Sequence, residues 1–235
     1  FLWPLASFIM SASFFAFFGI DSLTRERAFG EFREESEEIV RVLRNRMAES
    51  LGSVNAVGAF YEASTEVEPG EFVSFVSRIM ANDPSILRMT WNPRPDRGGS
   101  GQESGSLPVP ADFPVAFQLS SPGAGPGLFD GTGADRAVSA AIDAACKSGE
   151  TALTAPFSLR GASGTRTAIV LVVPVFRKGL PLETVKDRRS ALGGVATGVC
   201  AMDDWMRKAI VDLDPHDIES YVYDVTDADA PLLLA

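Results

Sequence analysis

The pattern of apolar and polar positions divides the chain into an apolar start, a long helical stretch and a mixed remainder. The first twenty residues carry no charge. A helix of that length spans about 30 Å, the thickness of a hydrocarbon core, at about 1.5 Å per residue. We therefore predict a transmembrane helix over residues 1–20, with the core of a signal peptide as the alternative.

Residues 21–66 follow with the spacing of an amphipathic helix. No proline occurs between Asp21 and Glu62, and charged side chains separate apolar residues that recur every three or four positions. These apolar residues are Phe29, Phe32, Ile39, Leu43, Met47, Val54, Val57 and Tyr61. The pattern predicts a stalk helix that pairs with a second copy of the chain. The alternative is a helix that packs only on its own domain.

Beyond the stalk, helical and alternating patterns succeed one another. Pro69 stands where a helix begins, and Gly149 stands where an alanine-rich helix ends in a left-handed cap. Pro156 and Pro174 fall inside strand-like runs, where a proline removes a ladder hydrogen bond. The predicted helices cover residues 69–81, 133–149 and 203–210, and the predicted strands cover 86–93, 112–121, 151–159, 165–178, 192–202 and 218–225. A polar crossover is expected over 179–191.

Composition narrows the range of functions. The chain has 21 Lys+Arg against 31 Asp+Glu, a formal net charge of -10, which argues against a nucleic-acid-binding surface. It has one histidine, His216, and two distant cysteines, Cys146 and Cys200, which we expect to be free and buried rather than joined. No phosphate-binding loop or zinc motif is complete. We therefore predict no catalytic residue, no metal site and no cofactor.

One carboxylate stands out in a glycine-rich stretch. Asp130 follows the apolar Leu128 and Phe129 and precedes Gly131. A desolvated carboxylate at this place would accept a hydrogen bond from a ligand N–H, a bond worth about 1.5–3 kcal/mol. A turn-forming aspartate before glycine is the alternative.

Four stretches together resemble the CHASE sensory domain, the extracellular ligand-binding module of receptor histidine kinases and nucleotide cyclases. They are residues 57–94, SGETALTAPFSL at 148–159, the apolar strand and its return at 168–199, and ESYVYDVTDADAPLL at 219–233. The second stretch is similar to plant cytokinin receptors.

The resemblance implies an α+β fold with a long stalk helix and two stacked PAS-like modules built on antiparallel sheets. On this basis residues 67–178 form the membrane-distal, ligand-binding module. Residues 179–235 form a membrane-proximal module that is incomplete at its C-terminus.

The resemblance also implies a ligand site. In cytokinin receptors an aspartate before the alanine-rich helix bonds the purine; Asp130 takes that place here, and Asp135 is the second choice. The backbone of Leu153 is the other polar contact. The implied walls are Phe113, Val115, Phe117, Leu171, Val173 and Val195. The implied ligand is cytokinin-like, or another small heterocycle or amine.

Together these features predict an extracytoplasmic ligand-sensing domain of a receptor in the inner or plasma membrane, lying in the periplasm or outside the cell. Signals would pass through a stalk homodimer. The catalytic domain, a histidine kinase or a cyclase, would lie outside this chain, so we expect no enzymatic activity in it. The alternative is a ligand-free domain that dimerises or docks a periplasmic protein.

Overall fold

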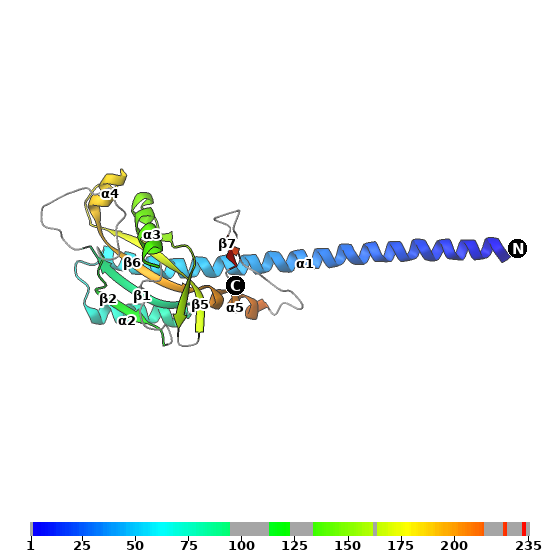
Figure 1. Ribbon diagram of the computed structural model, residues 1–235, viewed down its shortest axis with the longest axis horizontal. Helices are drawn as coiled ribbons and strands as arrows, with labels where there is room; N and C mark the ends of the chain where they lie inside the picture. The colour runs from blue at the N-terminus through cyan, green and yellow to red at the C-terminus, as the bar shows by residue number, and fades with distance from the viewer. Residues whose placement is uncertain are drawn as a thin grey trace.

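A long helix and an antiparallel sheet dominate the structure, a computed structural model (Figure 1). The structure describes residues 2–94, 113–122, 134–161, 164–213, 223–224 and 232–233 of the 235-residue chain. Helix α1 (Leu2–Ala63) runs along the sheet and extends far beyond it. The prediction of a fold that mixes helices with antiparallel sheet is confirmed.

The main sheet joins strands that lie far apart in the sequence. Its order is β2-β1-β6-β5-β3, with β4 also paired to β5, and every pairing is antiparallel. The strands are β1 (Ile86–Pro93), β2 (Phe117–Ser120), β3 (Ala152–Leu153), β4 (Phe157–Gly161), β5 (Gly164–Phe176) and β6 (Leu192–Ala201). A separate pair consists of β7 (Tyr223–Asp224) and β8 (Leu232–Leu233).

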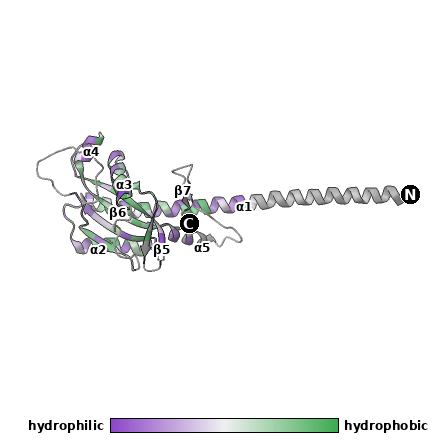
Figure 2. Ribbon diagram, in the orientation of Figure 1, coloured by the Kyte–Doolittle hydropathy of each residue, from purple (hydrophilic) through white to green (hydrophobic). Residues whose placement is uncertain are grey.

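Helices cover both faces of this sheet. The remaining helices are α2 (Pro69–Asn82), α3 (Ala134–Ser148), α4 (Val185–Ala191) and α5 (Met202–Leu213). Helices α1, α2 and α5 contribute to the apolar cluster on one face, and α3 contributes to the cluster on the other. Figure 2 shows hydrophobic residues along the strands between these helices. Because side chains alternate along a strand, β5 and β6 feed both clusters.

Two glycines let α1 lie close against the centre of the sheet. A Cβ added at Gly58 of α1 would lie 2.6 Å from Val173 Cγ1 on β5. A Cβ added at Gly198 of β6 would lie well inside van der Waals contact with Val54 Cγ2 on α1. Val54 is itself 1% exposed, so it has no room to retreat. The absence of side chains at these two positions therefore sets the distance between helix and sheet.

The contact of α1 with its own domain corrects part of the predicted dimer seam. Val54 and Val57 are buried against the sheet, so at these positions the alternative of a helix packed on its own domain holds. Ile39 is also buried within the chain. Phe32, Val40 and Met47 stay exposed, and Figure 2 shows that hydrophilic residues predominate where α1 leaves the sheet.

The predicted boundary between two modules at residue 178 does not separate the strands of this sheet. Strand β6 comes from the segment assigned to the second module, yet it lies between β1 and β5 of the first. The physical reason is that β6 is buried on both faces, which requires a central place in a covered sheet. The segment predicted as a polar crossover contains α4 and returns the chain from β5 to β6.

The strand predicted over residues 151–159 is also divided. Strand β3 ends at Leu153 and β4 begins at Phe157, and both pair with β5. Pro156 lies in the gap, where it has no N–H to donate to the ladder. Of the strand predicted over 218–225, the structure describes Tyr223–Asp224.

Helix α3 is tied to the segment before β6 through its C-terminal end. Gly149 has a φ of 81° and donates its N–H to the Ala145 carbonyl at 2.8 Å, so the predicted left-handed cap is confirmed. Arg188 of α4 donates to the carbonyls of Cys146 (3.2 Å) and Lys147 at that end. A guanidinium there complements the partial negative charge of the helix C-terminus.

Asp143 provides the second tie between α3 and α4. Its carboxylate, in a residue that is 4% exposed, lies 2.6 Å from Lys147 Nζ and 2.7 Å from Arg189 Nη2. Burial raises the pKa of Asp143, but hydrogen bonds from Lys147 and Arg189 and their positive charges outweigh it. The result is a pKa below the ordinary value of 3.8.

The search for membrane-spanning segments, confined to the residues that the structure describes, found no helix sufficiently long and apolar. The side chains of residues 1–20, over which the span is predicted, lie outside the described part of the chain.

Replacing Gly198 with alanine should destabilise the domain by about 1–3 kcal/mol, because the added methyl group overpacks the contact between β6 and α1. Urea unfolding followed by circular dichroism measures this. Gly52→Ala is the matched control, since a Cβ there meets nothing within 4 Å and alanine favours a helix interior. An unchanged midpoint for Gly198→Ala would show that α1 does not need its close approach.

Replacing Asp143 with asparagine should lower the melting temperature at pH 7, with a loss of roughly 1–3 kcal/mol from the charged hydrogen bonds. The carboxylate has a lower pKa in the folded chain, so its stabilisation is full above the unfolded-state pKa and disappears as the pH falls through the folded-state pKa. Melting curves should therefore converge in acid. The exposed Glu150→Gln serves as the control; a gap that persists at pH 2 would contradict the ion-pair account.

Candidate functional site

Helix α3 covers the apolar part of one sheet face. Its buried residues are Val138, Ala141, Ile142, Ala145 and Cys146. They share a cluster with Val170 and Val172 of β5 and with Val195 and Val199 of β6. The part of this face formed by β1 and β2 has a different character.

Six polar side chains occupy that part of the same face, and we call them the polar patch. They are Arg88, Thr90 and Asn92 of β1, Gln118 and Ser120 of β2, and Thr197 of β6. The β1 members are two residues apart, so they point to one side, while Met89 and Trp91 point to the α1 side. The register places Thr90 opposite both Gln118 and Thr197.

Hydrogen bonds connect the patch across strands. The hydroxyls of Thr90 and Thr197 lie 2.7 Å apart, and the Thr90 hydroxyl also donates to Asn92 Oδ1. Asn92 Nδ2 donates to the Phe113 carbonyl at 3.1 Å. At the other end Arg88 Nε donates to Ser120 Oγ at 2.9 Å. The patch is therefore an ordered network of donors and acceptors.

Burial of these polar side chains lowers the stability of the fold, because each must give up its contacts with water. Arg88 and Thr90 are 5% and 4% exposed, and Asn92 and Thr197 are both 7% exposed. Desolvation lowers the pKa of Arg88, although a guanidinium stays charged at every physiological pH. A sheet face beside an apolar helix would be more stable with apolar residues, since buried polar groups must be desolvated. Polar side chains kept at such a place are typical of a binding site.

Sequence reasoning missed the polar patch, although the run ILRMTWNP contains the signal. Its polar residues alternate strictly with Met89 and Trp91, which indicates a strand with one polar and one apolar face. Such a strand between two covering layers places its polar face against the protein rather than in water.

The structure divides the predicted wall residues between the two faces of the sheet. Phe113 and Val195 belong to the α3 side, where Val195 pairs with Asn92 of the patch. Leu171 and Val173 are buried on the α1 side, and Phe117 packs there as well. Because the middle of β5 is apolar on both sides, its sequence does not indicate which residues point to which face of the sheet. The structure places Val170 and Val172 on the α3 side. Val115 is 46% exposed.

Leu153 lies on β3, at the edge of the sheet. Thr154 N–H donates to the Val170 carbonyl at 3.0 Å, and the Thr154 hydroxyl accepts from Val170 N–H. Because backbone groups alternate in direction along a strand, the N–H and C=O of Leu153 point away from β5. This is the orientation that the predicted backbone contact to a ligand needs. The Leu153 side chain is 49% exposed.

The side chains of both predicted ligand acids lie outside the described part of the chain. Asp130 lies outside the described residues. Asp135 lies in the first turn of α3, and its side chain is outside the described part of the chain.

The two cysteines are free and buried, as predicted. Cys146 belongs to the cluster beneath α3 and Cys200 to the cluster on the α1 face. Burial raises the pKa of both thiols. Within the described residues no group of three or more His, Cys, Asp and Glu side chains is placed to hold a metal ion.

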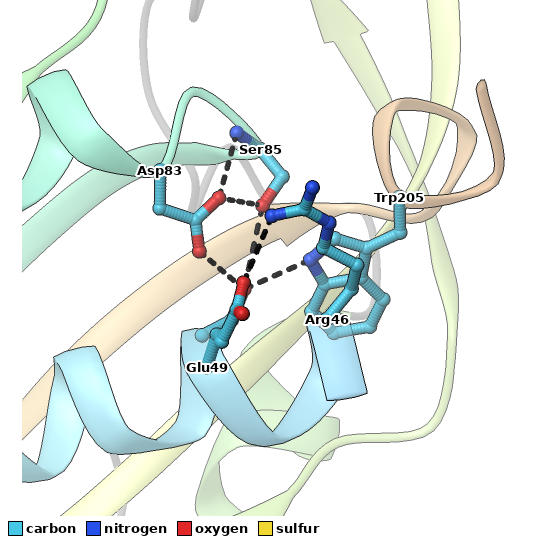
Figure 3. Close-up of polar contacts among 6 residues, drawn as sticks. Arg46, Glu49, Asp83, Ser85 and Trp205 are labelled. Atoms are coloured by element: carbon cyan, nitrogen blue, oxygen red, sulfur yellow. Dashed lines mark hydrogen bonds and ion pairs between the residues drawn. The ribbon is translucent and has the colours of Figure 1, made fainter. Parts of the chain in front are cut away.

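A hydrogen-bonded junction joins the ends of β1 and β6 to the stalk (Figure 3). The buried Ser50 hydroxyl of α1 donates to Asp83 and accepts from Trp205 Nε1 of α5 at 3.0 Å. Asp83 also accepts from Ser85, the residue before β1. The Ser85 carbonyl accepts from Ala201 N–H at the end of β6, at 3.0 Å. Strands β1 and β6 carry most of the patch. The start of β1 and the end of β6 thus meet at one contact with α1 and α5.

A groove of about 500 Å³ lies on the opposite face, where α1 ends. Its floor includes Tyr61 stacked on Trp91, with ring centroids 3.9 Å apart. Glu62, Glu66 and Lys178 line its edge, and Lys178 donates to the Ala63 carbonyl at the helix end. Arg177 lines the groove as well, so two acidic and two basic residues balance there and no net charge points to a ligand.

One solved sensory domain has a similar fold. The extracellular domain of a protein assigned as a histidine kinase aligns with a TM-score of 0.50 and 13% identity, over 89% of this chain and 71% of that one. At this identity the likeness concerns the fold alone.

Two chemoreceptor domains align less well. The periplasmic sensory domain of a Campylobacter jejuni chemoreceptor has a TM-score of 0.45 and 10% identity, over 81% of this chain. This chain spans 65% of that domain. The ligand-binding domain of a Pseudomonas aeruginosa amino acid chemoreceptor, solved with GABA, has a TM-score of 0.38 and 13% identity, over 72% of this chain and 61% of that one.

A family model matches the C-terminal part of the chain. No curated protein matches the chain in sequence. The model of the CHASE domain matches residues 132–234, a range that contains α3, β5 and β6. This segment, less than half of the chain, is therefore similar to the CHASE domain, in agreement with the resemblance drawn from the sequence.

Proposed function

We propose that this chain is the extracytoplasmic ligand-sensing part of a membrane receptor, and that it binds a small polar molecule over the polar patch beside α3. The observation that carries the proposal is a set of hydrogen-bonded polar side chains, four of them buried, on the sheet face that α3 covers in part. The match to a sensory-domain family supports it. Asp130 and the outward backbone of Leu153 are the further contacts that the sequence predicts.

The junction at Ser50 offers a route from the patch to the stalk. A ligand that draws β1 and β6 together would move Ser85 and Ala201, which contact each other at the strand ends. Both neighbour the Ser50 contact with Asp83 and Trp205. Ligand binding shifts such a contact only when the ligand prefers one of two arrangements. In this proposal α1 and α5 carry the shift toward a kinase or cyclase domain outside the chain.

The exposed apolar residues of α1 support a stalk homodimer. Phe32 is 55% exposed, Val40 52% and Met47 41%. They lie seven or eight positions apart, so they fall on one side of the helix, as a two-helix interface requires. The dimer in this proposal uses these residues rather than Ile39, Val54 and Val57.

Removing two hydroxyls from the patch should weaken ligand binding at least tenfold, about 1.4 kcal/mol. A thermal-shift screen of the purified chain with amino acids, carboxylic acids, adenine and isopentenyladenine first identifies binders. Calorimetry then compares the wild type with a Thr90→Val, Thr197→Val double variant. Thr165→Val, at an exposed position of β5, is the matched control. Unchanged affinity in the double variant would place the site elsewhere, and a screen without binders would favour the ligand-free docking alternative.

A cysteine at position 40 should form an intermolecular disulfide under mild oxidation, because the two stalks would bring these positions together. Non-reducing electrophoresis of the Val40→Cys chain measures the dimer, and the buried Cys146 and Cys200 do not compete. Arg41→Cys is the control, since position 41 is exposed and lies on another side of α1. Equal crosslinking at both positions would argue against a specific stalk interface.

A further inference from the structure

We propose that the groove at the end of α1 is a second ligand site, and that it takes a small, uncharged aromatic molecule with one hydrogen-bonding group. The groove lies on the sheet face opposite the polar patch, so this inference goes beyond the proposed function and does not depend on it. The observation that carries it is a buried hydroxyl, on a residue that lines the groove, with no hydrogen-bond partner among the described residues.

Tyr61 brings this hydroxyl to the groove. It stands two residues before the last residue of α1 and lines the groove. Its ring is stacked on Trp91, with ring centroids 3.9 Å apart, and the ring of Phe72 lies at 6.3 Å on α2. Packing against these two rings therefore sets the position of the hydroxyl.

A buried hydroxyl without a partner is rare and lowers the stability of a fold. The large majority of buried polar side-chain atoms have a hydrogen-bond partner, whereas the Tyr61 hydroxyl has none within the described part of the chain. Burial also raises its pKa, so the group stays protonated and can both donate and accept a hydrogen bond. Phenylalanine would keep the ring contacts without the desolvation cost. A molecule in the groove would supply the missing partner and account for tyrosine at this position.

The walls of the groove suit an aromatic ring. Four aromatic and two aliphatic side chains contribute to them. They are Tyr61, Trp91, Phe117, Phe176, Val67 and Val175. Aromatic rings pack on one another in offset-stacked or edge-to-face arrangements that add to the effect of apolar burial. The volume of about 500 Å³ falls within the range of small-molecule sites.

The charges of the groove favour a ligand without a charge of its own. Glu62 and Glu66 are balanced by Arg177 and Lys178, and Lys178 already donates to the Ala63 carbonyl at 2.9 Å. A charged ligand would meet a like-charged pair together with the opposite pair, so little attraction would offset the loss of its hydration. An amide, a hydroxyl or an indole N–H meets the Tyr61 hydroxyl without that loss.

Aromatic compounds that differ in one property at a time test this class. Thermal shift and calorimetry on the purified chain compare benzamide and indole with benzoate and benzylamine, which carry a charge. Cyclohexanecarboxamide lacks the aromatic ring, and toluene lacks the hydrogen-bonding group. We expect benzamide or indole to raise the melting temperature, because a compound that binds only the folded chain stabilises it. The other four compounds should bind at least tenfold more weakly.

Replacing Tyr61 with phenylalanine removes the hydroxyl and keeps the ring. This variant should bind benzamide or indole at least tenfold more weakly. Without any compound its melting temperature should not fall, because the hydroxyl makes no hydrogen bond in the unliganded chain. Tyr223→Phe, at a position that is 51% exposed, is the matched control and should change neither quantity.

A Tyr61→Phe chain that melts at a lower temperature and binds as before would show that the hydroxyl serves the fold through an ordered water, and would overturn the site. Failure of every compound to bind would overturn it as well. Benzoate or benzylamine bound as tightly as benzamide would overturn the uncharged class. Binding that survives Tyr61→Phe but is lost in the Thr90→Val, Thr197→Val double variant would place the compound over the polar patch, which supports the proposed function and overturns the groove.

Discussion

Burial of β5 and β6 on both faces is the constraint on which the rest of this structure depends. A strand with apolar side chains on both sides needs two covering layers, and α3 and α1 supply them. Helix α1 fits only because Gly58 and Gly198 leave space at the contact. The same contact removes Val54 and Val57 from any interface with another chain. A single packing requirement thus fixes the central strands, places the stalk and limits where the stalk can dimerise.

The polar patch is the exception within this apolar architecture. Strand β1 is paired on both sides and buried. Its residues Arg88, Thr90 and Asn92, which lie on the α3 side of the sheet, are nevertheless polar. The hydrogen bonds between Thr90, Thr197 and Asn92 offset part of the desolvation cost, and they also hold β1 and β6 in one register. A patch of this kind stabilises the fold less than apolar residues would, which is why we propose it as the ligand site.

Position along β1 connects the patch with the stalk. Arg88 lies three residues after Ser85, which shares the Asp83 carboxylate with Ser50 of α1. Trp205 of α5 donates to the same Ser50 hydroxyl, so a small movement of β1 reaches two helices at once. At the opposite end of the module, Arg188 and Asp143 tie α4 to α3. The patch therefore lies between two anchored ends of the module.

The sequence by itself determined the elements whose signals are local. Pro69 marks the start of α2, Gly149 caps α3, and Pro156 interrupts the strand beside β5, each through its own backbone geometry. The resemblance in residues 148–233 agrees with the CHASE domain model, which matches residues 132–234. These features need no knowledge of distant parts of the chain.

Only the tertiary structure decided the order of strands and the two faces of the sheet. Strand β6 is mostly apolar, and nothing in its sequence says that it lies between β1 and β5. Leu171 and Val173 of β5, which the resemblance placed in the ligand wall, belong to the cluster on the α1 face. The patch itself joins Thr90 to Thr197, 107 residues later, and a contact over that separation follows from register and covering helices rather than from any local pattern.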